Sequence, residues 1–182
     1  MKTIILILWM ISLFIPIRGQ GKYLTNNGTI KFYSHTVIED ITAENRRVAA
    51  VVDAKKGEVA VIVMMREFQF EKKLMQEHFN ENFVESEKYP KAFFNGTIEN
   101  NDSVDYDSPG IYPVTVLGEL KIHGVTRSFS TVGTLEVTAN GIVARTSFLL
   151  NPEDYEIKIP RVVRDNIAEN MEITVELGCN PI

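Results

Sequence analysis

The chain has 182 residues, with 19 basic and 24 acidic side chains, a formal net charge of −5 and a single cysteine. The charge argues against nucleic acid as a partner, because affinity for a phosphate backbone comes from clustered Lys and Arg, and the basic pairs here are scattered. One cysteine cannot form an internal disulfide, so the stability of the fold must come from packing.

The first 19 residues have the pattern of a secretory signal peptide. Lys2 gives a positive start, and residues 4–15 form an apolar run that ends at a proline. A membrane-spanning helix needs roughly 20 apolar residues, so this run is too short for a stable membrane anchor. We expect cleavage after Gly19, which leaves residues 20–182 as one domain. The expected location is the periplasm or the medium.

Alternation of apolar and polar residues with a period of two dominates the mature chain, which is typical of strands with one buried face. In residues 114–122, for example, Val116, Leu120 and Ile122 share one face while Glu119 and Lys121 share the other. The same pattern predicts eight strands, at residues 29–34, 48–53, 58–64, 91–98, 114–122, 127–137, 142–150 and 171–177.

Turn residues lie between these runs at the spacing of hairpins, at Lys56-Gly57, His123-Gly124 and Asn140-Gly141. Asn and Gly tolerate the positive φ that tight hairpin turns need. Eight strands joined mainly by hairpins indicate an all-β fold, either an up-and-down antiparallel barrel or a strongly bent sandwich.

Helix is expected in only two places. Residues 71–80 are the best candidate, because their apolar and polar side chains separate onto two faces. The first of these faces holds Leu74, Met75, His78 and Phe79. A second short helix is expected after Pro160, since proline suits the first helical position. Residues 100–113 are rich in turn formers and are expected to be a loop within the domain.

No set of residues carries an enzyme motif. The histidines His35, His78 and His123 are not spaced as metal ligands, and the acidic residues 102–110 lack the ligand positions of a calcium loop. The chain has neither a nucleophile elbow nor a glycine-rich phosphate loop. Cys179 is interpreted as a residue of the C-terminal tail. We therefore expect no catalytic residue, no metal and no cofactor.

Phenylalanines gather in the sequence around the expected helix. A filled core and a ligand cavity explain such a group equally well. Its members are Phe68, Phe70, Phe79, Phe83, Phe93 and Phe94.

Three stretches carry a resemblance to a known family. They are residues 70–94, residues 118–127 with the pattern G-x-L-x-(I/L)-x-G-V-T, and residues 154–175. Together they resemble the YceI family over residues 28–177. Where that family often has a G-x-F step after the first strand, residues 43–48 read Ala-Glu-Asn-Arg-Arg-Val. This departure is typical of a divergent branch.

The resemblance implies an eight-stranded antiparallel barrel of lipocalin type, with one or two short helices. It also implies an apolar lipid as the ligand, such as a polyisoprenoid or a quinone, held inside the barrel. On this interpretation the ligand-binding residues are Phe70, Leu74, Phe79, Phe83, Phe94, Val116, Leu120, Ile122, Phe129 and Phe148.

Three functions stay open from the sequence. The first is an exported, non-catalytic protein that holds an apolar lipid. The second is a filled barrel that acts through its surface in stress response or protein interaction, since a barrel of this size can be filled or can hold one slender ligand. The third and weakest is a hydrolase or metal enzyme that uses His35, His78 or His123.

Overall fold

The computed structural model describes residues 21–182, so the expected leader lies outside the described residues. Within this range nine strands form one sheet. They are β1 (Lys22–His35), β2 (Asp40–Asp53), β3 (Glu58–Met64), β4 (Gln69–Phe70), β5 (Lys91–Ile98), β6 (Gly110–Ile122), β7 (Val125–Thr138), β8 (Gly141–Leu150) and β9 (Met171–Pro181). The helical elements are η1 (Met65–Glu67), α1 (Lys73–His78), η2 (Phe79–Phe83), η3 (Asn101–Ser103), η4 (Pro152–Tyr155) and η5 (Arg161–Asn166).

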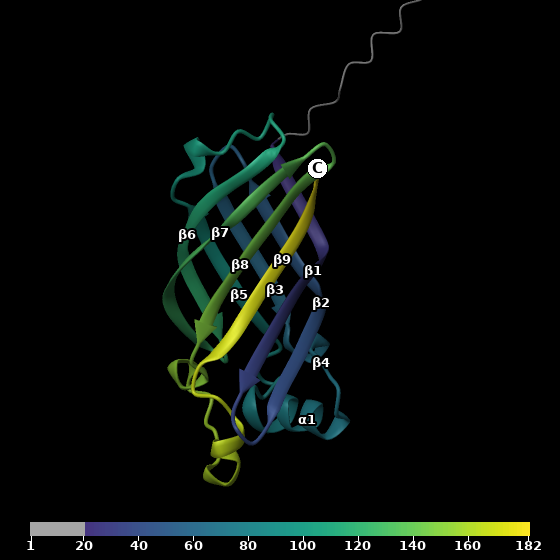
Figure 1. The fold of residues 1–182 in the computed structure, drawn as a ribbon, viewed down its shortest axis with the longest axis vertical. Helices are drawn as coiled ribbons and strands as arrows, with labels where there is room; N and C mark the ends of the chain where they lie inside the picture. The colour runs from purple at the N-terminus through teal and green to yellow at the C-terminus, as the bar shows by residue number, and fades with distance from the viewer. Residues whose placement is uncertain (1–20) are drawn as a thin grey trace, which may run out of the picture.

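The sheet closes on itself. Leaving aside the two-residue β4, which pairs with β2, each strand pairs with its neighbours in the chain, and β1 pairs with both β2 and β9. The result is an up-and-down antiparallel barrel of eight long strands (Figure 1). This confirms the predicted barrel and all eight predicted strands, and the bent sandwich is wrong because the ring of strand pairs has no gap.

The hairpin turns are close to those predicted, with one shift. His123 and Gly124 both have positive φ, 51° and 81°, as a two-residue turn requires. At the next hairpin the turn residues are Ala139 and Asn140, and Gly141 is already the first residue of β8. A Cβ at Gly141 would lie 2.2 Å from the carbonyl oxygen of Cys179. The glycine is therefore required by the close approach of β9.

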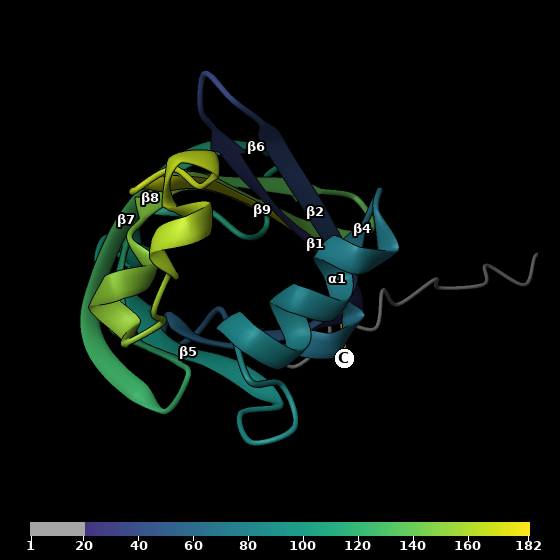
Figure 2. The same cartoon turned by 90° about the horizontal axis from the view of Figure 1, so that it is seen from below.

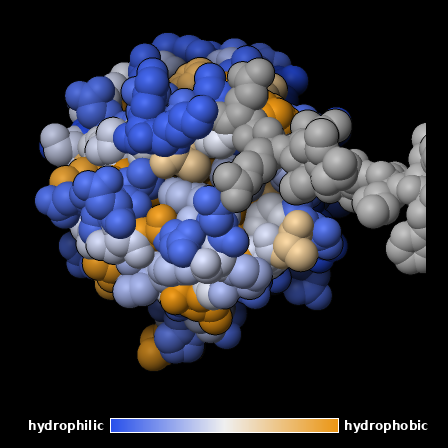
Figure 3. Space-filling view, turned by 90° about the horizontal axis from the view of Figure 1, so that it is seen from above, coloured by the Kyte–Doolittle hydropathy of each residue, from blue (hydrophilic) through white to orange (hydrophobic). Residues whose placement is uncertain are grey.

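The upper half of the barrel, at the top of Figure 1, is filled with apolar side chains. Leu135 and Ile142 are among the most deeply buried. Above them the Tyr106 ring stacks on Tyr23 at 6.0 Å between centroids, and its hydroxyl donates to Asn101 Oδ1 at 2.8 Å. Burial raises the pKa of Tyr106 to about 12. Seen from above, this end has a mostly hydrophilic surface (Figure 3), so a packed interior lies under a polar cover.

Two connecting segments surround the lower end of the barrel. Residues 65–90 contain α1 and η2, and residues 151–170 contain η4 and η5. Seen from below, α1 lies on one side of this end and the 151–170 segment on the other (Figure 2). The predicted helix at residues 71–80 is present as α1 and the π-helical turn η2, and the helix expected after Pro160 is the 3-10 helix η5.

The helices are all short. In the part of the chain that the structure describes, none has the length and apolar character needed to cross a membrane.

Cys179 lies inside strand β9, where it pairs with Ile142 of β8. Its side chain is buried, with 2% of the residue exposed. The interpretation as a tail residue was wrong, because β9 continues to Pro181 and packs the sulfur into the upper core. Burial raises the pKa of the thiol from 9.0 to about 11.

We expect Cys179 to be nearly inert in the folded protein. A pKa of about 11 instead of 9.0 lowers the thiolate fraction at pH 8 about 100-fold, and the thiolate is the reactive form. Titration with a disulfide reagent at pH 8 should give a slow reaction for native protein and a fast one in denaturant. Equal rates in the two states would contradict the burial. The pKa of Cys179 is higher in the folded than in the unfolded protein, so the thiol contributes to the free energy of unfolding. This contribution is fully present below pH 9.0 and is lost as the pH rises through about 11.

Candidate functional site

The lower half of the barrel contains a cavity of about 300 Å³. This is at the small end of the range of roughly 300–1,000 Å³ that is usual for ligand pockets. Its lining has 27 residues, 24 of them apolar. They come from every long strand except β7 and from both connecting segments at the lower end, residues 65–90 and 151–170. The polar members are Glu39, His78 and Asn166. The barrel is thus filled in one half and hollow in the other.

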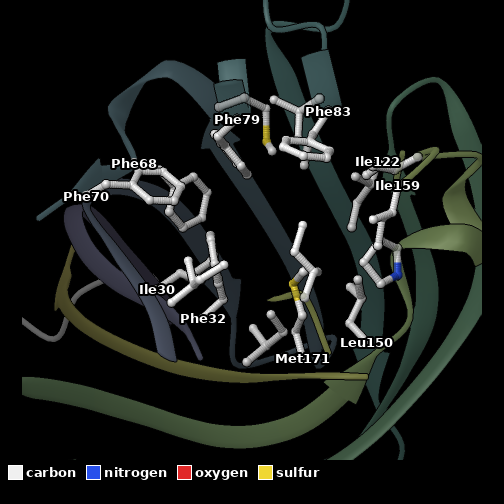
Figure 4. A pocket seen from close by; sticks show the side chains of 18 of the residues that line it. Ile30, Phe32, Phe68, Phe70, Phe79, Phe83, Ile122, Leu150, Ile159 and Met171 are labelled. Atoms are coloured by element: carbon white, nitrogen blue, oxygen red, sulfur yellow. The ribbon is translucent and has the colours of Figure 1, made fainter. Parts of the chain in front are cut away.

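One wall of the cavity is aromatic. Phe32 projects from β1 into a group formed with Phe68, Phe70 and Phe79 (Figure 4). The ring centroids within this group are 5.1 to 5.8 Å apart. Aromatic pairs at such distances add about 0.5–1.5 kcal/mol each beyond simple burial. The group therefore attaches the segment carrying α1 firmly to the barrel.

The opposite wall is aliphatic and comes mainly from alternate residues of three strands. Ile122 of β6, Leu150 of β8 and Met171 of β9 lie there together with Ile159 (Figure 4). Alternation along each strand explains the pattern, because every second side chain points into the barrel. Met171 adds an unbranched, flexible side chain that can adapt to the shape of a ligand.

Six of the ten predicted ligand-binding residues line the cavity. They are Phe70, Phe79, Phe83, Leu120, Ile122 and Phe148. Phe129 packs behind the lining, 4.7 Å from Phe148 and 5.9 Å from Phe94 between ring centroids. Phe94 and Val116 pack against the buried core.

Leu74 is placed elsewhere. It lies on α1 with 61% of the residue exposed, and it is not among the lining residues. The helix has only six residues and presents Met75 and His78 to the cavity. A helix this short offers one narrow face to the barrel, and Leu74 falls outside that face.

Much of the lining was not predicted from the sequence. Phe32 on β1, and Ile173 and Val175 on β9, line the cavity. The alternation of β9 was visible in the sequence and could have identified its members. Ile157 and Ile167, in contrast, come from an irregular segment with no periodic pattern to indicate which side chains point inward.

The three histidines lie in separate places. His35 Nδ1 is 2.5 Å from Asp40 Oδ1 on the outside of the barrel, and His78 is on α1. His123 Nε2 lies 2.8 Å from Glu85 Oε2, and its Nδ1 lies 3.2 Å from the carbonyl oxygen of Tyr155. His123, in the β6–β7 turn, therefore contacts both connecting segments of the lower end, residues 65–90 through Glu85 and residues 151–170 through Tyr155. Within residues 21–182 no group of three or more His, Cys, Asp or Glu side chains could hold a metal ion.

A closed up-and-down barrel, packed at one end and hollow at the other, is a β-barrel of lipocalin type. The family model of the YceI-like domain matches residues 23–179 of this chain. The chain belongs to the YceI-like family, which confirms the resemblance seen in the sequence.

Several solved structures share this fold. A polyisoprenoid binding domain from Saccharophagus degradans, implicated in plant cell wall breakdown, superposes with a TM-score of 0.78 at 14% identity, over 90% of this chain and 99% of that one. BcnA of Burkholderia cenocepacia gives 0.68 at 13%, over 82% and 94%. The YceI protein of Campylobacter jejuni gives 0.63 at 16%, over 81% and 89%. No curated protein matches the sequence.

Proposed function

We propose that this protein is an exported, non-catalytic binding protein that holds one apolar lipid, such as a polyisoprenoid or a quinone with an isoprenoid tail. The observation that carries the proposal is the apolar cavity, in which 24 of 27 lining residues are apolar. His78 lines the cavity and is exposed at the same time, so the cavity reaches solvent at the lower end of the barrel. The leader predicted from the sequence supports a location in the periplasm or the medium.

The size of the cavity limits what it holds without rearrangement. At about 30 Å³ for each small group, 300 Å³ has room for roughly ten carbon atoms. Ten methylenes at about 0.8 kcal/mol each supply roughly 8 kcal/mol, which is comparable with the cost of association, about 4 to 15 kcal/mol. A longer tail would need the 151–170 segment to move away from α1, or would extend into solvent.

Two further observations support binding without catalysis. The S. degradans domain of the same fold is described as polyisoprenoid binding. The cavity lining among the described residues contains no Ser, Thr or Cys that could serve as a nucleophile. A barrel that is filled throughout and acts only through its surface has less support, because its lower half is hollow.

Lipid extraction tests this function. Protein secreted from its own host and purified without detergent should carry close to one equivalent of an apolar lipid, detected by mass spectrometry of the organic extract. After the lipid is removed, the protein should bind farnesol with an affinity that is absent in a heat-denatured sample. Protein that carries no lipid and binds no isoprenoid alcohol would overturn the proposal.

A further inference from the structure

The three polar residues of the cavity come from three elements at the lower end of the barrel. Glu39 is in the β1–β2 turn, His78 is on α1 and Asn166 is on η5. No Lys or Arg is among the lining residues. Glu39 is therefore the one carboxylate that the described lining presents to a ligand.

Glu39 is held in place by two hydrogen bonds. Its Oε1 accepts from Lys72 Nζ at 2.8 Å, and its Oε2 accepts from Asn166 Nδ2 at 3.3 Å. The hydrogen bond from Lys72 is the main reason that the pKa of Glu39 lies below its ordinary value. With 25% of its side chain exposed, the ionised group is positioned at the opening rather than deep inside.

Two of the cations near this opening already have partners. Lys72 is paired with Glu39 and does not itself line the cavity. Arg164, on η5, is paired with Glu153. A negatively charged head group at the opening would face the carboxylate of Glu39 without a free cation in the lining, and like charges brought together disfavour binding.

Hydrogen-bonding groups for an uncharged head are present. Glu39 accepts hydrogen bonds, and the amide of Asn166 has both donor and acceptor capacity. His78 makes no hydrogen bond or ion pair with another described residue. A hydroxyl group, which donates one hydrogen bond and accepts others, matches this set.

We propose that Glu39 selects the ligand by its head group: the cavity takes an isoprenoid alcohol or a similar uncharged donor, and rejects the same chain carrying a phosphate or diphosphate. This inference rests on the proposed function and adds to it the chemical class of the head. The tail would lie against the apolar walls, and the head would lie between Glu39, His78 and Asn166.

The test compares farnesol with farnesyl diphosphate on delipidated protein by isothermal titration. Wild-type protein should bind farnesol at least 10-fold more tightly than the diphosphate. Glu39→Gln should strengthen diphosphate binding about 10-fold and so bring the two affinities closer together, because the carboxylate is removed and Lys72 is freed. Lys72→Met should weaken diphosphate binding further, because it leaves Glu39 without its cation.

Glu77→Gln is the matched control. This substitution also removes one carboxylate charge, here from α1, but Glu77 does not line the cavity. The ratio of the affinities for farnesol and farnesyl diphosphate should therefore stay as in the wild-type protein. If wild-type protein binds the diphosphate as tightly as farnesol, or if Glu77→Gln changes the ratio as much as Glu39→Gln, head-group selection by Glu39 is wrong while lipid binding stands. If neither compound binds, the proposed function itself fails. Thermal unfolding of each variant shows that it is folded at the temperature of titration.

Discussion

Leu120→Trp should abolish lipid binding while the barrel stays folded. Leu120 is on β6 and lines the cavity, so the larger indole would occupy space that the ligand needs. If it displaces about five methylenes at about 0.8 kcal/mol each, the loss is roughly 4 kcal/mol, or about 1,000-fold in affinity. The measurements are the amount of lipid retained after purification and the midpoint of thermal unfolding.

Leu117→Trp is the control for this variant. Leu117 is on the same strand, three residues earlier, and is 38% exposed on the outer face. The same substitution there should leave both lipid content and stability close to the parent values. In a filled interior, Leu120→Trp would instead overpack the core and destabilise the fold by about 1–3 kcal/mol. That outcome, from a parent that carries no lipid, would contradict the hollow barrel.

The strands could be predicted because one face of each is apolar over most of its length, but their ends could not. β1 was expected at residues 29–34 and begins at Lys22. Its first half contains Asn26, Asn27 and Gly28, which break the alternation. In the structure this stretch has register shifts between Thr25 and Ile30 in its pairing with β2. The strand persists through this irregular pairing, but its residues lose the apolar–polar alternation by which a strand is identified in the sequence.

The site was harder to predict than the fold for a related reason. Alternation shows which side of the barrel a residue faces, and it does not show how far along the barrel axis the residue lies. Val116 and Leu120 share a face of β6, yet Val116 pairs with Ile98 in the packed half, while Leu120 borders the cavity. The position of the cavity depends on how the irregular 151–170 segment meets the lower end.

The glycines of the β5–β6 pair make a prediction about the fold itself. Gly96 and Gly118 are directly opposite each other in the two strands. A Cβ at Gly118 would lie 2.3 Å from the carbonyl oxygen of Asn95 and 2.5 Å from the Cα of Gly96. Both neighbours are backbone atoms, so no side chain can turn aside to make room, and the two strands would have to separate.

Gly118→Ala should therefore destabilise the protein by about 3 kcal/mol, at the upper end of the usual cost of overpacking. Gly178→Ala in β9 is the matched control, because a Cβ there meets no atom within 4 Å. At such a compatible site, Gly→Ala is neutral or stabilises by up to about 1 kcal/mol, since it restricts the unfolded chain. Denaturant unfolding of the two variants beside the parent measures the difference. Equal stability would mean that the strands tolerate a wider spacing, and that Gly118, the first residue of the G-x-L-x-(I/L)-x-G-V-T pattern, is not required by their close approach.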